Sequence, residues 1–346
     1  MSRILVFRLG SLGDAVVSLP ALHLLAAATP GAERILLTNQ PVSAQAAPAA
    51  ELLIGTGLLH RVIEFPPALR SPGQAWDLRQ RIRAESPEAL VYLSEPKPRP
   101  SLLRDVGFFA TCGIFRMIGL PWSDDRRRHR PQNGRWESEA GRLVRCLEDL
   151  GSIDLTDRAA WDLHLSDDEG ATAGSVLAGW PGADNFAAFA IGTKHEANDW
   201  GDDAWMETLR SADRPSLGLA LIGAEIERER LERVATAWSG PVLNLAGCLP
   251  LRVTAAVLAR ARVFIGHDSG PMHLAAAAGT PVCAVFSGRN KPGIWFPAGT
   301  ADRILYPLTD CVGCGGSVCE GRAHVCMTEH RPADVAALIT SITDPL

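Results

Sequence analysis

Residues 263–279, VFIGHDSGPMHLAAAAG, combine a short apolar run, a glycine-containing turn and an alanine-rich run. This order predicts a buried strand, a turn and a helix. Ser269 is expected to cap the helix, and Gly270 and Pro271 fall in its first turn, so several backbone N–H groups point out of the strand end. Together with the helix dipole these groups would suit a phosphate, which Asp268 and His273 would flank. The alternative to phosphate binding is an ordinary turn of an α/β protein that binds no ligand, and this stretch alone does not decide between the two.

The same arrangement occurs at the start of the chain. Residues 4–7 predict a strand, RLGSLGD follows, and apolar spacing over 16–25 predicts a helix. Gly10 and Gly13 permit a tight turn or close approach of a ligand, and Asp14 falls at the helix start. Asp14 is either an ordinary acid of a first helical turn or a catalytic group. The three glycines of a dinucleotide fingerprint are absent.

Alternating strands and helices continue through the chain, which predicts parallel, doubly wound sheets. The further predicted strands cover residues 34–37, 61–65, 89–93, 186–191, 217–222, 242–245 and 282–286. A third glycine-containing turn, Gly192-Thr193-Lys194, follows one of them. A length of 346 residues predicts two domains, which we place at 1–170 and 171–346. Ligands of such sheets bind beyond the carboxyl ends of the strands.

Composition restricts the class of protein. Hydrophobic residues make up 47% and charged residues 21%, as in ordinary globular proteins. No apolar run reaches about 18 residues, and the first residues enter a strand directly without a signal peptide, so a cytoplasmic location is expected. A formal charge of −5 argues against general nucleic-acid binding.

Two segments of the first half invite a prediction about an acceptor. Residues 107–120 are apolar and aromatic, which predicts a buried helix or the wall of a pocket. Residues 124–135, DDRRRHRPQNGR, predict a solvated loop. The alternative for this charge run is a basic lip that meets an anionic acceptor or an acidic membrane surface.

Half of the eight cysteines cluster near the C-terminus. Cys311, Cys314, Cys319 and Cys326 have the spacing C-x2-C-x4-C-x6-C. They could form a structural zinc or iron site, remain reduced packing thiols, or take part in redox or disulfide chemistry. A catalytic metal is not expected, because four protein ligands would leave no open position.

Three motifs together resemble glycosyltransferase family 9, the ADP-heptose:lipopolysaccharide heptosyltransferases. They are ILVFRLGSLGDAVVSLPAL, IGHDSGPMHLAAAAGTPVCAVF and CVGCGGSVCEGRAHVCM. The resemblance implies a GT-B architecture, with two facing Rossmann-like domains, the first for the acceptor and the second for the nucleotide sugar. It also implies an inverting transfer that needs no metal or other cofactor, and a final helix, residues 332–342, that packs back towards the first domain.

The resemblance assigns roles to individual residues. Asp14 would be the general base, with Gly10, Ser11 and Gly13 bordering the acceptor. Lys194 would contact the donor phosphates and act in catalysis. The other implied donor-binding residues are Thr193, Gly223, Glu227, which would meet the ribose, and Asp268, Ser269, Gly270, Pro271, Met272 and His273. One departure concerns Lys194, which lies further before Trp200 than the family's lysine lies before its tryptophan.

The chemistry of glycosyl transfer agrees with these roles. The reaction needs a base near the nucleophile and positive charge near the leaving diphosphate. The sequence contains no Asp-x-Asp pair of the kind that holds a metal in many glycosyltransferases. A helix N-terminus and Lys194 would supply the positive charge instead.

The expected partners are an ADP-sugar donor and a glycan or lipid-linked acceptor, with no nucleic acid and at most peripheral contact with the inner face of the membrane. The alternatives are a related transferase with another nucleotide sugar or a protein or small-molecule acceptor, a nucleotide-sugar epimerase, and a metal-stabilised scaffold protein.

Overall fold

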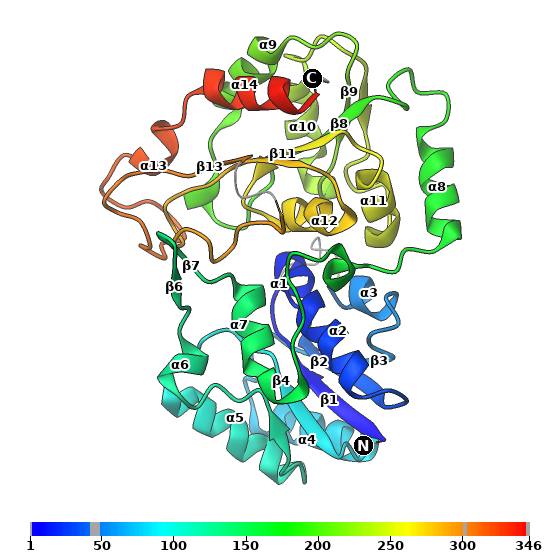
Figure 1. Ribbon diagram of the computed structural model, residues 1–346, viewed down its shortest axis with the longest axis vertical. Coiled ribbons are helices and arrows are strands. Elements are labelled where there is room, and N and C mark those ends of the chain that lie inside the picture. The colour runs from blue at the N-terminus through cyan, green and yellow to red at the C-terminus, as the bar shows by residue number, and fades with distance from the viewer. Residues whose placement is uncertain (1, 42–48, 300–302, 344–346) are drawn as a thin grey trace. The chain divides into compact units, whose positions relative to one another are not determined.

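The computed structural model describes residues 2–41, 49–299 and 303–343. By its internal contacts the chain divides into two compact units, Met1–His164 and Leu165–Leu346. The division lies close to the domain boundary that we place at residue 170. Each unit contains a parallel sheet with helices on both faces (Figure 1).

The first unit has its sheet strands in the order β3-β2-β1-β4-β5. These strands are β1 (Arg3–Phe7), β2 (Glu33–Asn39), β3 (Arg61–Phe65), β4 (Ala89–Tyr92) and β5 (Met117–Ile118). Leu5 of the central strand lies opposite Ile35 of β2 and Leu90 of β4. All neighbours in this sheet are parallel, as the strand–helix alternation predicts.

Helices cover both faces of this sheet because its central strands are apolar on both sides. The helices of the unit are α1 (Leu12–Val17), α2 (Leu19–Ala28), α3 (Ala49–Ile54), α4 (Pro72–Glu85), α5 (Arg99–Thr111), α6 (Asp124–Arg127) and α7 (Glu139–Cys146), with short 3-10 turns at Glu148–Leu150 and Arg158–Trp161. Leu78 of α4 and Phe109 of α5 pack with Leu5 and Tyr92 in one core. On the opposite face α2 and α7 lie in contact (Figure 1).

The second unit has the strand order β10-β9-β8-β11-β12-β13, and all neighbours are again parallel. Its strands are β8 (Phe186–Ala190), β9 (Gly218–Leu221), β10 (Val242–Asn244), β11 (Val263–His267), β12 (Val282–Val285) and β13 (Ile304–Leu305). In both units the strand order reverses at the centre, between β1 and β4 and between β8 and β11. This is the Rossmann-like order, and such reversal points are where ligands of these sheets bind.

The helices of the second unit are α8 (Asp167–Leu177), α9 (Asp202–Ala212), α10 (Arg228–Ala235), α11 (Leu251–Leu258), α12 (Gly270–Ala278), α13 (Val325–Thr328) and α14 (Pro332–Thr343), with short 3-10 turns at Glu196–Asn198 and Glu225–Glu227. The final helix α14 packs along α9 of its own unit (Figure 1). Val335 and Ile339 of α14 enter the same core as Phe189 and Trp205. No helix in the described ranges is both long and apolar enough to cross a bilayer.

Two predictions for the first unit are wrong in part. The apolar segment 107–120 buries Phe109 and Ile114, but its helix ends at Thr111 and Phe115 is 82% exposed. The segment is therefore not buried as a whole. Its last part forms the short edge strand β5 instead.

The charge run 124–135 is not a simple loop. It forms α6 and then a hairpin of β6 (Pro131–Gln132) with β7 (Arg135–Trp136). Arg126 pairs with Glu148 at 2.8 Å, and Arg130 pairs with Asp125 at 2.7 Å. These arginines have acidic partners, so the run is not a block of uncompensated positive charge.

Candidate active site

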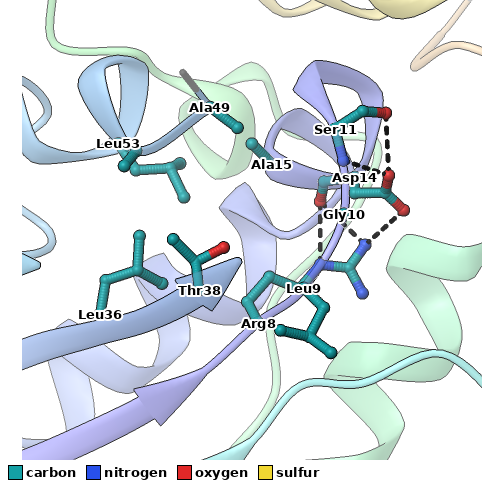
Figure 2. A pocket seen from close by; sticks show the side chains of 11 residues that line it. Arg8, Leu9, Gly10, Ser11, Asp14, Ala15, Leu36, Thr38, Ala49 and Leu53 are labelled. Carbon is teal, nitrogen blue, oxygen red and sulfur yellow. Dashed lines mark hydrogen bonds and ion pairs between the residues drawn. The ribbon is translucent and has the colours of Figure 1, made fainter. Parts of the chain in front are cut away.

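The loop after β1 lies where the first sheet reverses its strand order. Gly10 adopts a φ of +132°, and a Cβ built on it would lie 2.2 Å from Asp14 Cγ. Ser11 is the N-cap of α1, and its backbone N–H and Oγ donate to Asp14 Oδ2 at 2.7 and 3.0 Å. Asp14 thus has the structural role of an acid in the first turn of a helix. Its other carboxylate oxygen, Oδ1, takes no part in the two hydrogen bonds from Ser11 (Figure 2).

Arg8 holds this turn against the sheet. Its buried guanidinium donates to the carbonyl oxygen of Asp14 at 3.0 and 2.8 Å and to that of Leu93 at 3.1 Å. The nitrogen Nη2 also lies 3.4 Å from Asp14 Oδ1 (Figure 2). The ends of β1 and β4 and the start of α1 are therefore joined by one side chain.

A buried ionic network continues behind Arg8. Glu139 is 1% exposed, accepts from Arg142 at 2.7 Å, contacts His129 at 3.0 Å and lies 3.6 Å from Arg8. Burial by itself raises the pKa of Glu139, but the hydrogen bonds from Arg142 and His129 and the charge of Arg8 lower it to about 2. Glu139 is therefore a permanent negative charge that balances two buried arginines.

Glu95 lies beyond the end of β4, next to Asp14. Loss of surrounding water, the negative charge of Asp14 and a hydrogen bond with its side chain raise the pKa of Glu95. A negative charge close to a buried carboxyl group makes ionisation of that group less favourable. Glu95 is therefore protonated more readily than an exposed glutamate.

A small open hollow lies beside the turn (Figure 2). It is lined by Arg8, Leu9, Gly10, Ser11, Asp14, Ala15, Leu36, Thr38, Ala49, Ala50 and Leu53. Gly10 and Ser11 thus border a space beside Asp14. Gly13 is buried within α1 and does not line the hollow.

In the second unit, Glu227 lies over the ends of two strands. Its Oε2 accepts the backbone N–H of Ala224 at 2.7 Å. A Cβ on Gly192 would lie 1.6 Å from Glu227 Oε1, and a Cβ on Gly223 would lie 2.5 Å from Oε2. The glycines after β8 and β9 therefore make room for one carboxyl group, and burial raises its pKa.

The predicted phosphate turn follows β11. Ser269 is the N-cap of α12, but its side chain forms no capping hydrogen bond, contrary to the prediction. Its Oγ is buried and has no partner among the residues that the structure describes. Gly270, Pro271 and Met272 form the first turn, so a polar side chain is held at the helix N-terminus without an internal acceptor.

Asp268 and His273 flank this turn. Asp268 Oδ1 lies 3.9 Å from His273 Nε2, and the His273 ring lies 6.1 Å from the ring of Trp295. Burial raises the pKa of Asp268 to about 7, although Asn290 and Arg289 oppose the shift. Asp268 can therefore donate or accept a hydrogen bond near neutral pH.

His267 ties the ends of β8 and β11 together. Its Nδ1 lies 3.1 Å from the carbonyl oxygen of Ile191, while Nε2 accepts from the Trp200 backbone N–H and from Trp205 Nε1, both at 3.0 Å. Burial lowers the pKa of His267 to about 4. The ring is therefore neutral, and it fixes the loop between Lys194 and Trp200 against β11.

The comparisons with known proteins identify the family. The model described as glycosyltransferase family 9 (heptosyltransferase) matches residues 115–318, more than half of the chain. The chain belongs to glycosyltransferase family 9. A relative, lipopolysaccharide heptosyltransferase 1 of Pseudomonas aeruginosa, is 26% identical over 324 residues, which are 92% of this chain and 87% of the relative.

Solved structures support the fold of this glycosyltransferase. A family 9 glycosyltransferase from Veillonella parvula matches with a TM-score of 0.76 and 17% identity, over 99% of this chain and 97% of the other. ADP-heptose lipopolysaccharide heptosyltransferase II of Escherichia coli matches with a TM-score of 0.70 and 18% identity, over 99% and 98%. The GT-B fold class and the enzyme class predicted from the motifs are confirmed.

The cysteine-rich segment of the glycosyltransferase packs beside its loops 194–198 and 288–291. Ser317 accepts the backbone N–H of Ala197 at 3.0 Å, and the Gly313 N–H donates to the Gly288 carbonyl oxygen at 2.7 Å. The cysteines are free thiols. Within the described residues no three Cys, His, Asp or Glu side chains gather closely enough to hold a metal ion.

The structure thus groups the predicted residues of this glycosyltransferase at two strand-end sites. Asp14 with Gly10 and Ser11 lies in the first unit, and the α12 turn, Glu227 and Lys194 lie in the second. Sequence reasoning missed Arg8, Glu95, Glu139, His267 and Arg289. For Arg8 a local signal was available, because a charged residue directly after an apolar strand, here β1, suggests a role at the strand end.

Proposed function

We propose that this glycosyltransferase transfers a heptose or a related sugar from an ADP-linked donor to a hydroxyl of a lipopolysaccharide-type or other glycan acceptor. The single observation that carries the proposal is the site at the β8–β11 reversal. At this site Glu227 supplies a carboxyl group that can bind hydroxyls. Ser269 supplies a buried hydroxyl at the N-terminus of α12 that has no partner among the described residues. The third group is the exposed lysine Lys194. These groups suit the ribose and the diphosphate of a nucleotide sugar.

Asp14 is the proposed general base. Ser11 and Arg8 hold its carboxylate at the edge of the hollow, so the acceptor hydroxyl can approach the remaining oxygen. Asp14 would remove the proton as the acceptor oxygen attacks the anomeric carbon. Direct attack on the face opposite the leaving diphosphate inverts that carbon.

The donor site is proposed to work without a metal. The N-terminus of α12 and Lys194 would balance the charge that grows on the leaving diphosphate. Thr193 and Gly223 would border the donor, and Glu227 would accept hydrogen bonds from the ribose hydroxyls. Asp268 and His273 would contact the phosphates or the sugar through their polar atoms.

The named relatives support the choice of donor and acceptor. One is a lipopolysaccharide heptosyltransferase, and one solved structure is an ADP-heptose enzyme. We extend both properties to this chain as a proposal. A cytoplasmic location with peripheral contact at the inner face of the membrane belongs to the same proposal.

Calorimetric titration of the chain with ADP, UDP, GDP and CMP in the presence of chelator tests the donor. Selective ADP binding is the expected result. Preference for UDP or GDP would keep the family and discard the heptose donor. Consumption of an ADP-sugar without any acceptor would indicate an epimerase instead.

Replacement of Asp14 tests the base. Asp14→Asn should abolish transfer and leave ADP binding unchanged. Glu169→Gln is the matched control, because Glu169 accepts the N–H of Ser166 at the start of α8 as Asp14 accepts that of Ser11. The control should lose stability without losing transfer. Equal transfer by both variants would reduce Asp14 to a structural acid.

A further inference from the structure

Arg289 lies in the loop after β12, beside the α12 turn. Its backbone N–H donates to Ser287 Oγ at 3.2 Å. The Ser287 hydroxyl donates to Asn198 Oδ1 at 2.6 Å, and Asn198 Nδ2 lies 3.5 Å from the carbonyl oxygen of Asp268. This chain of polar contacts joins the Arg289 loop to the residue that precedes the N-cap of α12.

The guanidinium of Arg289 is held by neutral groups. Its Nε donates to the carbonyl oxygen of Gly316 at 3.0 Å, and Nη1 donates to Asn290 Oδ1 at 3.3 Å. The half-buried side chain forms no ion pair with any carboxylate in the described ranges. Its positive charge is therefore available to an anion, and its planar fork suits phosphate oxygens.

The charge of Arg289 acts on His195, the residue that follows Lys194 in the chain. Lys194 is exposed and, like Arg289, forms no ion pair within the described parts of the chain. Burial lowers the pKa of His195, and the positive charges of Arg289 and Lys194 lower it further. The Asp268 carboxyl group, on which the charge of Arg289 acts, has a pKa raised to about 7, so it balances that charge only in part near neutral pH, and the site favours an anionic ligand.

We propose that Arg289 binds the diphosphate of the nucleotide-sugar donor, in addition to Lys194, and that the cysteine-rich segment positions it. The proposal rests on the donor site proposed above. When the bond between the anomeric carbon and the β-phosphate oxygen breaks, the electron pair stays on that oxygen, and Arg289 stabilises the added negative charge.

The segment around residues 313–317 supplies the support for Arg289. The Gly316 carbonyl oxygen accepts a hydrogen bond from the Arg289 side chain, and the Gly315 N–H donates to the Arg289 carbonyl oxygen at 2.9 Å. Two residues of this segment therefore contact both the main chain and the side chain of Arg289. These contacts give the loop a role in positioning Arg289 that does not depend on any ligand of the thiols.

Binding of ADP and of adenosine to the full chain tests this role. Arg289→Gln should weaken ADP binding at least tenfold, about 1.4 kcal/mol, and leave adenosine binding unchanged. Arg289→Lys keeps the charge without the fork and should bind ADP with intermediate affinity. Arg331→Gln is the matched control, because Arg331 pairs with Asp334 on α14, and it should bind both ligands like the wild type.

Equal losses of ADP and adenosine affinity in Arg289→Gln would show a purely structural role and overturn the proposal. Unchanged ADP affinity would overturn it as well. Either result, with ADP bound by the wild type, leaves the proposed function standing. Failure of the wild-type chain to bind any nucleoside diphosphate would instead remove the donor site itself.

Discussion

Replacing Gly192 by alanine should disturb the donor site through Glu227. Gly192 does not have a positive φ, so its backbone conformation is open to alanine. The new Cβ would lie 1.6 Å from Glu227 Oε1 and 2.3 Å from its Cδ. The carboxyl group must therefore move, and the N–H of Ala224 would lose an acceptor at 2.7 Å.

The size of the effect follows from that hydrogen bond. A hydrogen bond to a charged group contributes about 1.5–3 kcal/mol, and the half-buried Glu227 can recover part of this by rotating, so we expect a loss of about 1–2 kcal/mol in the free energy of unfolding. Urea denaturation measures this loss. ADP affinity should fall about tenfold or more, equivalent to about 1.4 kcal/mol, if Glu227 holds the ribose.

A double-mutant cycle separates the steric effect from other causes. In a Glu227→Ala background the carboxyl group is gone, so Gly192→Ala should add little, which gives a coupling of about 1 kcal/mol or more. Gly170→Ala in α8 is the control, because its Cβ would meet nothing within 4 Å and should stabilise the helix by up to about 1 kcal/mol. Equal costs of Gly192→Ala in both backgrounds would refute the reasoning.

Three further predictions concern charge. Lys194→Ala should weaken ADP binding about tenfold without changing stability, because the exposed amine makes no ion pair in the described ranges; an unchanged calorimetric Kd would remove its role. Glu95→Gln should shift the acid limb of the pH–rate profile for transfer to lower pH, because glutamine removes the carboxyl group with a raised pKa that takes up a proton beside Asp14 as the pH falls; an identical profile would separate Glu95 from the reaction. Asp268 has a pKa raised to about 7, above the unfolded value of about 3.9. The folded state therefore keeps a proton that the unfolded state loses, and stability falls as pH rises between these values. Asp268→Asn should be more stable than the wild type at pH 8, by at most about 4 kcal/mol, and lose this advantage near pH 4; equal differences in urea denaturation at both pH values would contradict this.

Local patterns were sufficient for most of the fold. Apolar runs such as residues 4–7 and 263–265 predict the central strands, because a strand covered on both faces needs apolar residues at every position. The glycine-containing turns after these strands predict where the strand ends lie exposed. Since ligands of parallel sheets bind beyond the carboxyl ends of the strands, the sequence predicts ligand sites at Asp14 and Asp268, and the structure places both residues beyond central strands.

Local patterns were insufficient where long-range contacts decide the outcome. Phe115 belongs to an apolar segment, yet it is exposed because the helix before it ends at Thr111. The charge run at 124–135 forms a helix and a hairpin, and its Arg126 pairs with Glu148, which lies 22 residues further along the chain. Neither the exposure of Phe115 nor the pairing of Arg126 with Glu148 follows from the spacing of nearby residues.

The candidate site divides in the same way. The sequence by itself determined the residue types at the strand ends: Asp14 after one glycine turn, and Ser269 at the start of an alanine-rich helix. Only the tertiary structure decided how they are held, with Arg8 between Asp14 and Leu93, and Arg289 against Gly316. The reason is physical. A turn or helix start depends on neighbours within a few residues, whereas a buried charge is stable only when distant segments bring it a partner, and that requires the finished fold.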